Sequence, residues 1–523
     1  MTSSYPRILI EEDAGGDRTI TAVATSVTAF LGTAPQGPTD EAVRVVSLSE
    51  YTGRFGPLDP AHAMGFAVRD FFLNGGSEAV ICRLYRAPDH ASGCAGLTLP
   101  PGLGLVARSP GRWGDALLAR VDHTVSPGLA ESWGLTEADL FTLHVRLGPD
   151  GPLETFADLT VKGSPRVVDR VIEAESLLVR VADPSRLPPT RPDATPAPAA
   201  GADPWEQADS TVRVDVPGAD GLDLTDDDYR GDRGARTGKY LLDGIDLVNL
   251  VCVPGGAPTD DVSPSALGDL LAYCVERRAF LVVDSPSAWT HDDLVTDPDG
   301  MLATLGLEGT AARNAAIYYP RTRTADPAAG GLLATFPTCG AVAGVIARTD
   351  VHRGVWKAPA GTGATLTGIL GLADTVSDEE NGVLTRAGVN ALRTFPTHGT
   401  VVWGARTMRG ADEVADEFKY VPVRRTALFL EESLIRGLRW VVFEPNAEPL
   451  WVQIRLHVGE FLHSLFRQGA FQGTTPSEAY FVTCDADTTT PVDQGNGIVN
   501  IVVGFAPLRR AEFVVVTIRQ TTS

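Results

Sequence analysis

Continuous apolar runs and helical periodicities alternate along most of the chain and predict a mixed α/β fold. Residues 245–253 (IDLVNLVCV) and 279–284 (AFLVVD) are continuous apolar runs, which are typical of strands buried on both faces. Between them, residues 264–278 place their leucines on one side at helical spacing. A strand, a helix and a second strand in this order predict a βαβ unit in a sheet that helices cover on both faces.

The same pattern continues on both sides of this unit. Residues 21–32 and 79–85 are apolar and rich in β-branched side chains, so they predict two more buried strands. Residues 60–72 have helical spacing, and the Asn and Gly residues at 74–76 end that helix because both tolerate a left-handed cap. Residues 337–347 (PTCGAVAGVIA) predict a helix of small residues packed tightly against the sheet.

The last hundred residues carry the clearest periodicities. Residues 423–440 predict one long helix, and residues 447–468 predict a second whose apolar side chains form a single stripe. Residues 498–505 and 511–520 predict two strands joined by a turn.

Residues 87–235 differ from the rest of the chain, because short β-like pieces are separated there by loops. Residues 184–204 are rich in Pro and Ala and have few apolar side chains, so burial cannot offset their ordering entropy. They predict a linker or an exposed excursion, and the whole section is interpreted as a peripheral insertion.

Composition excludes several classes of function. The 523 residues include 44 basic and 66 acidic side chains, a net charge of −22 that argues against a phosphate-backbone binder. The chain contains no run of 18 or more uncharged apolar residues, so no membrane-spanning helix is predicted. The first seven residues do not have the pattern of a secretory signal. Six cysteines without a CxxC pair predict buried thiols in a reduced cytosolic chain.

The motifs that carry chemistry are incomplete wherever they occur. Residues 361–368 contain a GxG but lack the spacing and the Lys of a phosphate-binding loop. His457 and His463 are six residues apart on one helix. Two histidines that share a metal ion on a helix are normally four residues apart, on the same face, so this spacing does not predict a metal site. Asp284, at the end of a strand, is the one position suggestive of catalysis, although a helix cap or a turn explains it better. The sequence therefore predicts no catalytic, cofactor-binding or metal-binding residues.

The two ends of the chain are the most distinctive feature. Residues 513–518 (FVVVTI) and residues 8–10 (ILI) are strand-like segments close to the C-terminus and the N-terminus. Each can pair within its own chain's sheet or add a strand to the sheet of a neighbouring subunit. The residues alone leave both alternatives open.

Collinear motifs along the chain resemble the contractile tail sheath proteins of contractile phages, R-type pyocins and related contractile injection systems. The resemblance spans about residues 5–86 and 239–520. It is carried by YP at 5–6 with IEE at 10–12, TSVTAFLG at 25–32, APQGP at 34–38, FG at 55–56, AVRDFFLNGG at 67–76, VWKAPA at 355–360, KYVPVRR at 419–425, FEPN at 443–446, RQGAF at 467–471 and AEFVV at 511–515.

This resemblance implies a division of the chain into arms, core and insertion. Residues 1–20 correspond to an N-terminal arm and residues 506–523 to a C-terminal arm strand. Residues 21–86 and 236–505 together form the α/β core of a mixed α+β subunit. Residues 87–235 form a β-rich inserted outer domain.

The resemblance also implies a structural role without a cofactor. Family members stack as hexameric rings in a helical sheath around an inner tube, and on triggering the subunits rotate outward and drive the tube through a target envelope. The implied partners are further copies of the chain, the inner tube protein, and baseplate and cap or terminator proteins. Binding to nucleic acid and direct membrane insertion are not expected. Assembly in the cytoplasm is expected.

Specific residues follow from the resemblance. The arm role, completing sheets in neighbouring subunits, corresponds to Ile8 and Ile10 at one end and to Phe513, Val515 and Thr517 at the other. The helix predicted at 447–468 resembles the element that faces the tube.

Three of its side chains are candidate tube contacts, with ordinary surface positions as the alternative: Arg455, His457 and Arg467. A second class of function, a cytosolic α/β hydrolase-like enzyme with Asp284 in its site, also stays open.

Overall fold

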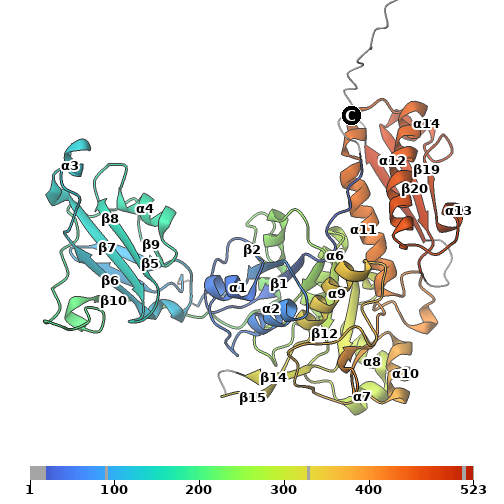
Figure 1. Cartoon of the computed structure of the whole chain (residues 1–523), viewed down its shortest axis with the longest axis horizontal. Helices are drawn as coiled ribbons and strands as arrows, with labels where there is room; N and C mark the ends of the chain where they lie inside the picture. Colours follow the sequence, from blue (N-terminus) through green and yellow to red (C-terminus); the bar gives the residue numbers. More distant parts are fainter. Residues whose placement is uncertain (1–18, 89–91, 327–329, 509–513, 522–523) are drawn as a thin grey trace, which may run out of the picture.

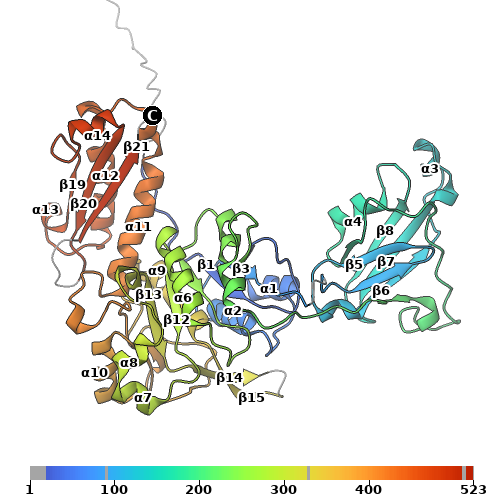
Figure 2. The same cartoon turned by 180° about the vertical axis from the view of Figure 1, so that it is seen from behind.

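The computed structural model describes residues 19–88, 92–326 and 330–508, together with the backbone of residues 514–521. The described chain forms a central α/β core, a β-rich lobe on one side of it and a helical subdomain on the other (Figure 1). The same three parts can be distinguished when the molecule is seen from behind (Figure 2).

The core is built on an eight-stranded sheet with the strand order β18-β17-β13-β12-β11-β1-β3-β2. The six inner strands are parallel, whereas β2 and β18 at the two edges are antiparallel to their neighbours. The strands are β1 Thr28–Gly32, β2 Val43–Val45, β3 Ala79–Arg83, β11 Leu250–Cys252, β12 Phe280–Asp284, β13 Ala315–Tyr319, β17 Asn390–Phe395 and β18 Gly399–Val402. The mixed α/β fold class predicted from the sequence is confirmed.

Helices cover both faces of this sheet, as the continuous apolar strands predicted. Alternate side chains of the central strands, such as Phe30 and Cys252, pack under α2 (Ala63–Leu73) and α9 (Cys339–Arg353). Their neighbours, such as Leu31, pack under α6 (Pro264–Glu276) on the opposite face. Burial on both faces explains why these strands lack the polar alternation of a half-exposed sheet.

The helix of small residues lies closer to its neighbour than larger side chains would permit. A Cβ atom added at Gly340 of α9 would lie 2.0 Å from the Ala67 carbonyl oxygen of α2, and one at Gly344 would lie 2.5 Å from the Phe71 carbonyl oxygen. The small-residue helix predicted at 337–347 is confirmed as α9, which begins at Cys339, packs against the sheet and also approaches α2 closely.

Shorter elements complete the core around the sheet. They are α1 Leu48–Phe55, α5 Asp226–Arg230, α7 His291–Thr296, α8 Pro298–Ala303, α10 Asp378–Ala387, β14 Thr322–Asp326, β15 Leu332–Phe336 and β16 Gly371–Leu372.

The lobe has a hydrophobic cluster of its own, built from residues 94–181. One sheet has the order β10-β6-β7-β8 and the other has the order β4-β5-β9. The elements are β4 Gly96–Leu99, β5 Leu103–Ala107, β6 Leu117–Asp122, α3 Leu129–Ser132, β7 Leu140–Leu147, β8 Leu153–Thr160, α4 Val168–Glu175, β9 Val179–Val181 and β10 Val212–Arg213. Residues 184–204 form no helix or strand and run along the lobe, where Thr195 bonds the Val121 backbone.

Arg83 fixes the lobe to the core where the chain first leaves the sheet. Its side chain is 1% exposed and donates to the carbonyl oxygens of Ala34 at 2.9 Å, Gly37 at 2.7 Å and Pro110 at 2.8 Å. Pro110 belongs to the lobe, and the other two carbonyls belong to the core. Burial lowers the pKa of the guanidinium to about 10, but the carbonyl oxygens satisfy its donors.

The C-terminal subdomain packs two helices against a three-stranded antiparallel sheet. The helices are α11 Val421–Gly437 and α12 Glu448–Arg467, and the sheet has the order β19-β20-β21. Its strands are β19 Tyr480–Thr483, β20 Ile498–Phe505 and β21 Val514–Thr521, with the short helices α13 Pro476–Ala479 and α14 Pro491–Gly495 between them. The long helices predicted at 423–440 and 447–468 and the strand pair at the C-terminus are confirmed.

Candidate assembly site

Both ends of the described chain lie on the C-terminal subdomain. From Thr19 the chain runs along α11, with Ile20 against Gly437 and the Val23 amide donating to the Ser433 hydroxyl at 3.3 Å. At the other end, β21 pairs with β20 over its full length and forms the edge of the sheet. The first and the last described residues therefore lie on the same subdomain.

The arm residues predicted from the sequence fall partly outside the described structure. Ile8, Ile10 and Phe513 lie outside the described residues. Val515 and Thr517 lie in β21, opposite Gly504 and Val502 of the same chain. Within a single subunit, β21 thus completes its own sheet, which is the first of the two alternatives. Donation of these strands to another subunit stays a prediction.

A buried ion pair joins this subdomain to the core. Arg425 of α11 donates to both carboxylate oxygens of Asp350 of α9, at 2.9 and 2.6 Å, and the two side chains are 4% and 3% exposed. The same guanidinium donates to the Thr25 carbonyl oxygen at 2.7 Å. One side chain therefore connects α11, α9 and the segment that leads from the N-terminus into β1. Such a bidentate pair fixes relative orientation as well as charge.

The three candidate tube contacts differ in their availability. Arg455 bonds Glu448 at 2.9 Å and the Cys484 carbonyl oxygen, so its guanidinium ties α12 to the loop after β19. His457 lies edge-on to Trp440, with ring centroids 5.9 Å apart. Arg467 is exposed in the last turn of α12, and among the described residues it forms no ion pair. Of the three, Arg467 is the one whose charge faces solvent.

The face of α12 that points away from the subdomain carries residues that sequence reasoning missed. The apolar stripe predicted on this helix is buried, as expected. Val452 and Leu456 lie outside that stripe and are 47% and 56% exposed, and His463 and Arg467 continue the same exposed face. The i,i+4 spacing of Val452 and Leu456 was the available signal, because they interrupt an otherwise polar face.

Asp284 caps a helix. Its Oδ1 atom accepts hydrogen bonds from the Thr338 amide at 2.5 Å, the Thr338 hydroxyl at 2.8 Å and the Cys339 amide at 2.8 Å, at the start of α9. The adjacent cavity measures only about 30 Å³, which is room for one water molecule. Among the described residues, no group of three His, Cys, Asp or Glu side chains is placed to bind a metal ion. The hydrolase alternative gains no support from this arrangement.

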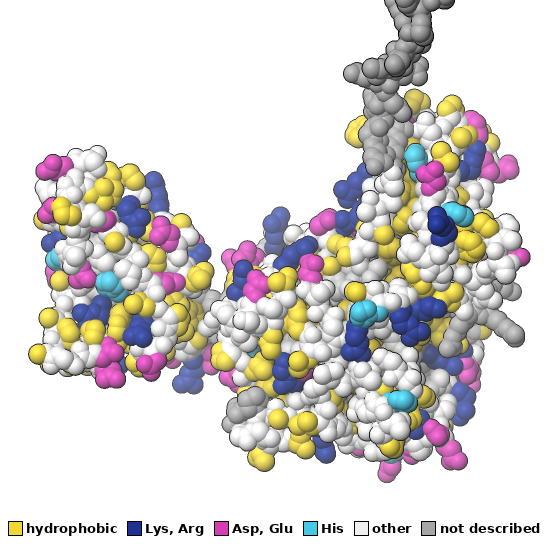
Figure 3. All heavy atoms as spheres, viewed as in Figure 1, with side chains coloured by type: hydrophobic (Ala, Val, Ile, Leu, Met, Phe, Trp, Pro, Cys, Tyr) yellow, Lys and Arg dark blue, Asp and Glu magenta, His cyan; other side chains and the backbone are white. Residues whose placement is uncertain are grey.

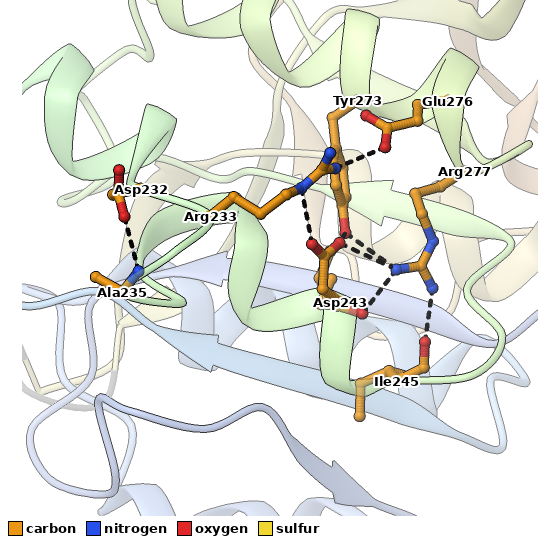
Figure 4. Close-up of polar contacts among 9 residues, drawn as sticks. Asp232, Arg233, Ala235, Asp243, Ile245, Tyr273, Glu276 and Arg277 are labelled. Carbon is orange, nitrogen blue, oxygen red and sulfur yellow. Dashed lines mark hydrogen bonds and ion pairs between the residues drawn. The ribbon is translucent and has the colours of Figure 1, made fainter.

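The densest polar cluster near α6 holds the chain where it returns from the lobe (Figure 4). Arg233 bonds Asp243 at 3.0 Å and Glu276 at 2.6 Å, and the Tyr273 hydroxyl donates to Asp243 at 2.8 Å. Arg277 donates to the Ile245 carbonyl oxygen at 2.6 Å. Since these charges are paired with one another, the cluster fastens residues 232–245 to α6 and leaves no unpaired nucleophile or base.

No helix among the described residues is long and apolar enough to cross a membrane. Taken together, the described structure defines an α/β scaffold in which both described ends lie on the C-terminal subdomain and α12 carries an exposed apolar pair.

Comparison with known proteins agrees with this description. Residues 239–408 match the family model described as the phage tail sheath protein central domain, which is about a third of the chain. No curated protein matches the sequence.

Solved structures extend the similarity over almost the whole chain. The helical sheath of the anti-feeding prophage in its contracted state is 22% identical with a TM-score of 0.55, covering 99% of this chain and 100% of that one. The sheath complex of PVC, an extracellular contractile injection system, in its contracted state is 21% identical with a TM-score of 0.55, covering 99% and 98%. The sheath tail protein of Listeria innocua is 13% identical with a TM-score of 0.64, covering 96% of each chain.

Residues 239–408 therefore resemble a tail sheath central domain, and nearly the whole chain has the fold of contractile sheath proteins. The resemblance predicted from the sequence is confirmed.

Proposed function

We propose that this chain is the structural subunit of a contractile sheath, which polymerises around an inner tube and drives that tube through a target envelope. The observation that carries the proposal is the agreement of fold with sheath proteins along nearly the whole chain, centred on a matching sheath domain. The anti-feeding prophage baseplate also contains a chain of similar fold, which supports association with a baseplate. Cap or terminator proteins and cytoplasmic assembly belong to the same proposal.

In this proposal the two ends of the chain link neighbouring subunits. Both ends leave from the C-terminal subdomain, and β21 lies at the edge of its sheet, so the pairing that it makes within one chain can be made by the same strand from a neighbour. Residues Ile8 and Ile10 act at the N-terminal side, and Phe513, Val515 and Thr517 act at the C-terminal side. Backbone pairing gives such links direction without requiring a catalytic site.

The inner tube lies against the exposed face of α12. Arg467 is retained as a tube contact because its charge faces solvent, and Val452 and Leu456 supply apolar contact on the same face. Arg455 and His457 act indirectly, because Arg455 holds Glu448 of α12 and His457 packs against Trp440. The lobe points outward, away from the tube.

Contraction in this scheme uses two arrangements of the same subunits. Arg425 and Asp350 keep the C-terminal subdomain fixed to the core, and Arg83 keeps the lobe fixed to it, so each subunit moves as one body. The arms stay connected while the subunits rotate outward. The energy comes from better packing in the contracted lattice, so contraction requires no nucleotide in this chain.

Removal of the arms tests the link between the ends and assembly. We expect variants lacking residues 1–14 or residues 511–523 to remain folded and to lose tubular assembly in the presence of the tube protein. Circular dichroism measures folding, and sedimentation with electron microscopy measures assembly. Long sheaths formed by either variant would show that the arms do not link the subunits.

A further inference from the structure

A cavity of about 520 Å³ opens on the lobe, between the start of β6 and the segment that carries β10. Its walls combine apolar side chains, among them Leu118 and Val214, with the charged side chains of Asp115, Glu206 and Arg213. Figure 3 shows basic, acidic and hydrophobic side chains side by side at the end of the lobe where β6 and β10 lie in Figure 1. A cavity of this volume is large enough for a small organic ligand.

The apolar part of the wall is held in a fixed position. The Arg120 and Arg146 guanidinium carbons lie 5.9 and 5.7 Å from a ring centroid of Trp205, which lines the cavity. Arg120 donates to the Ser210 carbonyl oxygen at 2.9 Å, and Arg146 donates to the Gly151 carbonyl oxygen at 3.1 Å. Because Trp205 is only 7% exposed, it presents an edge of its ring to the cavity and no open face. The wall is therefore formed before any ligand arrives.

The charged part of the wall is available to a ligand. Glu206 and Arg213 are exposed, and neither side chain forms an ion pair or a hydrogen bond with the described residues. Asp115 is held in place, because its Oδ1 atom accepts a hydrogen bond from the Gly218 amide at 2.6 Å. Its Oδ2 atom lies 4.0 Å from the Nε atom of the exposed Arg112. The cavity thus offers carboxylate acceptors and a guanidinium donor beside an apolar wall.

This combination disfavours several kinds of ligand. An anion such as phosphate would face two carboxylates and one guanidinium, so its net interaction with these charges is repulsive. A metal ion is not expected, because no group of three His, Cys, Asp or Glu side chains among the described residues is placed to bind one. A purely apolar ligand would take Glu206 and Arg213 out of water without giving them partners. The class that fits is a neutral ligand with an apolar face and hydrogen-bonding edges.

We propose that this cavity binds a neutral pyranose sugar, either free or at the end of a glycan chain. A pyranose ring has C–H groups on its faces and hydroxyl groups around its edge, and each hydroxyl both donates and accepts hydrogen bonds. Glu206 and Asp115 accept from hydroxyl groups, and Arg213 donates to a hydroxyl oxygen. The C–H groups lie against Leu118 and Val214. Because the cavity lies within the lobe, binding requires no assembled sheath.

Saturation-transfer difference NMR on the full chain tests the proposal, with the methyl glycosides of glucose, galactose and mannose as probes. We expect at least one of the three to bind. Glu206→Ala and Arg213→Ala should each weaken that binding about tenfold, because each removes hydrogen bonds to a charged group. Glu131→Ala, at an exposed position in α3 of the same lobe, is the matched control and should bind the glycoside as the wild type does. All three substituted side chains are exposed, and circular dichroism checks that the variants are folded.

Three results would overturn the proposal. The first is that none of the three glycosides binds, and the second is that Glu206→Ala and Arg213→Ala bind the glycoside as tightly as the wild type. The third is that inorganic phosphate or the zwitterion L-leucine displaces the glycoside at equal concentration. None of these results bears on sheath assembly, which is measured separately, so each would leave the proposed function standing.

Immobilised polysaccharide distinguishes the two sources of the sugar. Retention of the chain on a polysaccharide of the sugar that binds, displaced by the free glycoside, would show that the cavity takes the end of a glycan chain. Binding of the glycoside without retention on the polysaccharide would show that it takes the free sugar. Retention that the glycoside does not displace would contradict binding in this cavity.

Discussion

Arg425 and Asp350 show how single residues determine the arrangement of whole parts in this protein. Arg425 belongs to the KYVPVRR motif at 419–425, but its partner is 75 residues away on another helix, and only the fold brings them together. The same is true of Arg455 and His457, which were selected by residue type and turn out to have partners on their own subdomain. Residue type and spacing predict which face of a helix a side chain lies on. They cannot predict which long side chains form ion pairs or hydrogen bonds with residues distant in the sequence.

Removal of one member of the buried pair should be costly. Arg425→Met leaves the buried Asp350 carboxylate without its partner. We therefore expect this variant to lower the free energy of unfolding by about 3–5 kcal/mol. The double variant Arg425→Met/Asp350→Leu should recover most of this loss because no buried charge remains unpaired. Urea unfolding monitored by circular dichroism measures both. A loss below about 1 kcal/mol for Arg425→Met would show that the pair does not fix the subdomain.

Asp70 predicts a dependence of stability on pH. Burial raises the pKa of this carboxyl to about 6 against the opposing effect of Arg69, and no hydrogen bond to its Oδ2 atom is found in the described structure. Between about pH 4 and pH 6 the folded state therefore binds the proton more tightly than the unfolded state, so stability falls as pH rises.

Comparison with Asp70→Asn isolates this contribution. The asparagine cannot titrate, so we expect the stability of the wild type relative to the variant to fall by about 2 kcal/mol from pH 4 to pH 6. Unfolding curves at a series of pH values measure the difference. A difference that is constant across this range would show that Asp70 titrates normally.

At the scale of elements, the sequence predicted the helices and strands whose formation depends on the local pattern of residues. The buried stripe of α12, the central strands and the small-residue helix α9 all follow from periodicity and residue size. The order of the strands does not, because β1 pairs with β11 through a connection of more than two hundred residues that includes the lobe. The edge strand β18 and its neighbour β17 mix polar and apolar residues and gave no clear signal.

The close approach of α2 and α9 gives a test at this scale. An alanine at Gly340 would place its Cβ atom against the Ala67 backbone, which cannot yield as a flexible side chain could. We expect Gly340→Ala to destabilise the protein by about 1–3 kcal/mol. Gly268→Ala in α6 is the matched control, since no atom lies within 4 Å of the added Cβ, and it should stabilise by up to about 1 kcal/mol. Thermal unfolding of both variants distinguishes a tight helix contact from a general effect of glycine.

At the scale of the whole molecule, the distribution of charge fits a subunit of a large array. Residues 87–235 contain 24 Asp and Glu against 13 Lys and Arg, so this section carries half of the net charge of −22. In the proposed sheath this section faces outward, where like charge keeps a many-copy tube soluble. The charge is thus a property of the assembly's surface and identifies no substrate.

Negative-stain electron microscopy tests most directly whether the chain assembles into a contractile sheath. We expect the chain co-expressed with its tube protein to form a striated hollow tube. Particles that remain monomers or dimers, with and without the tube protein, would contradict the account.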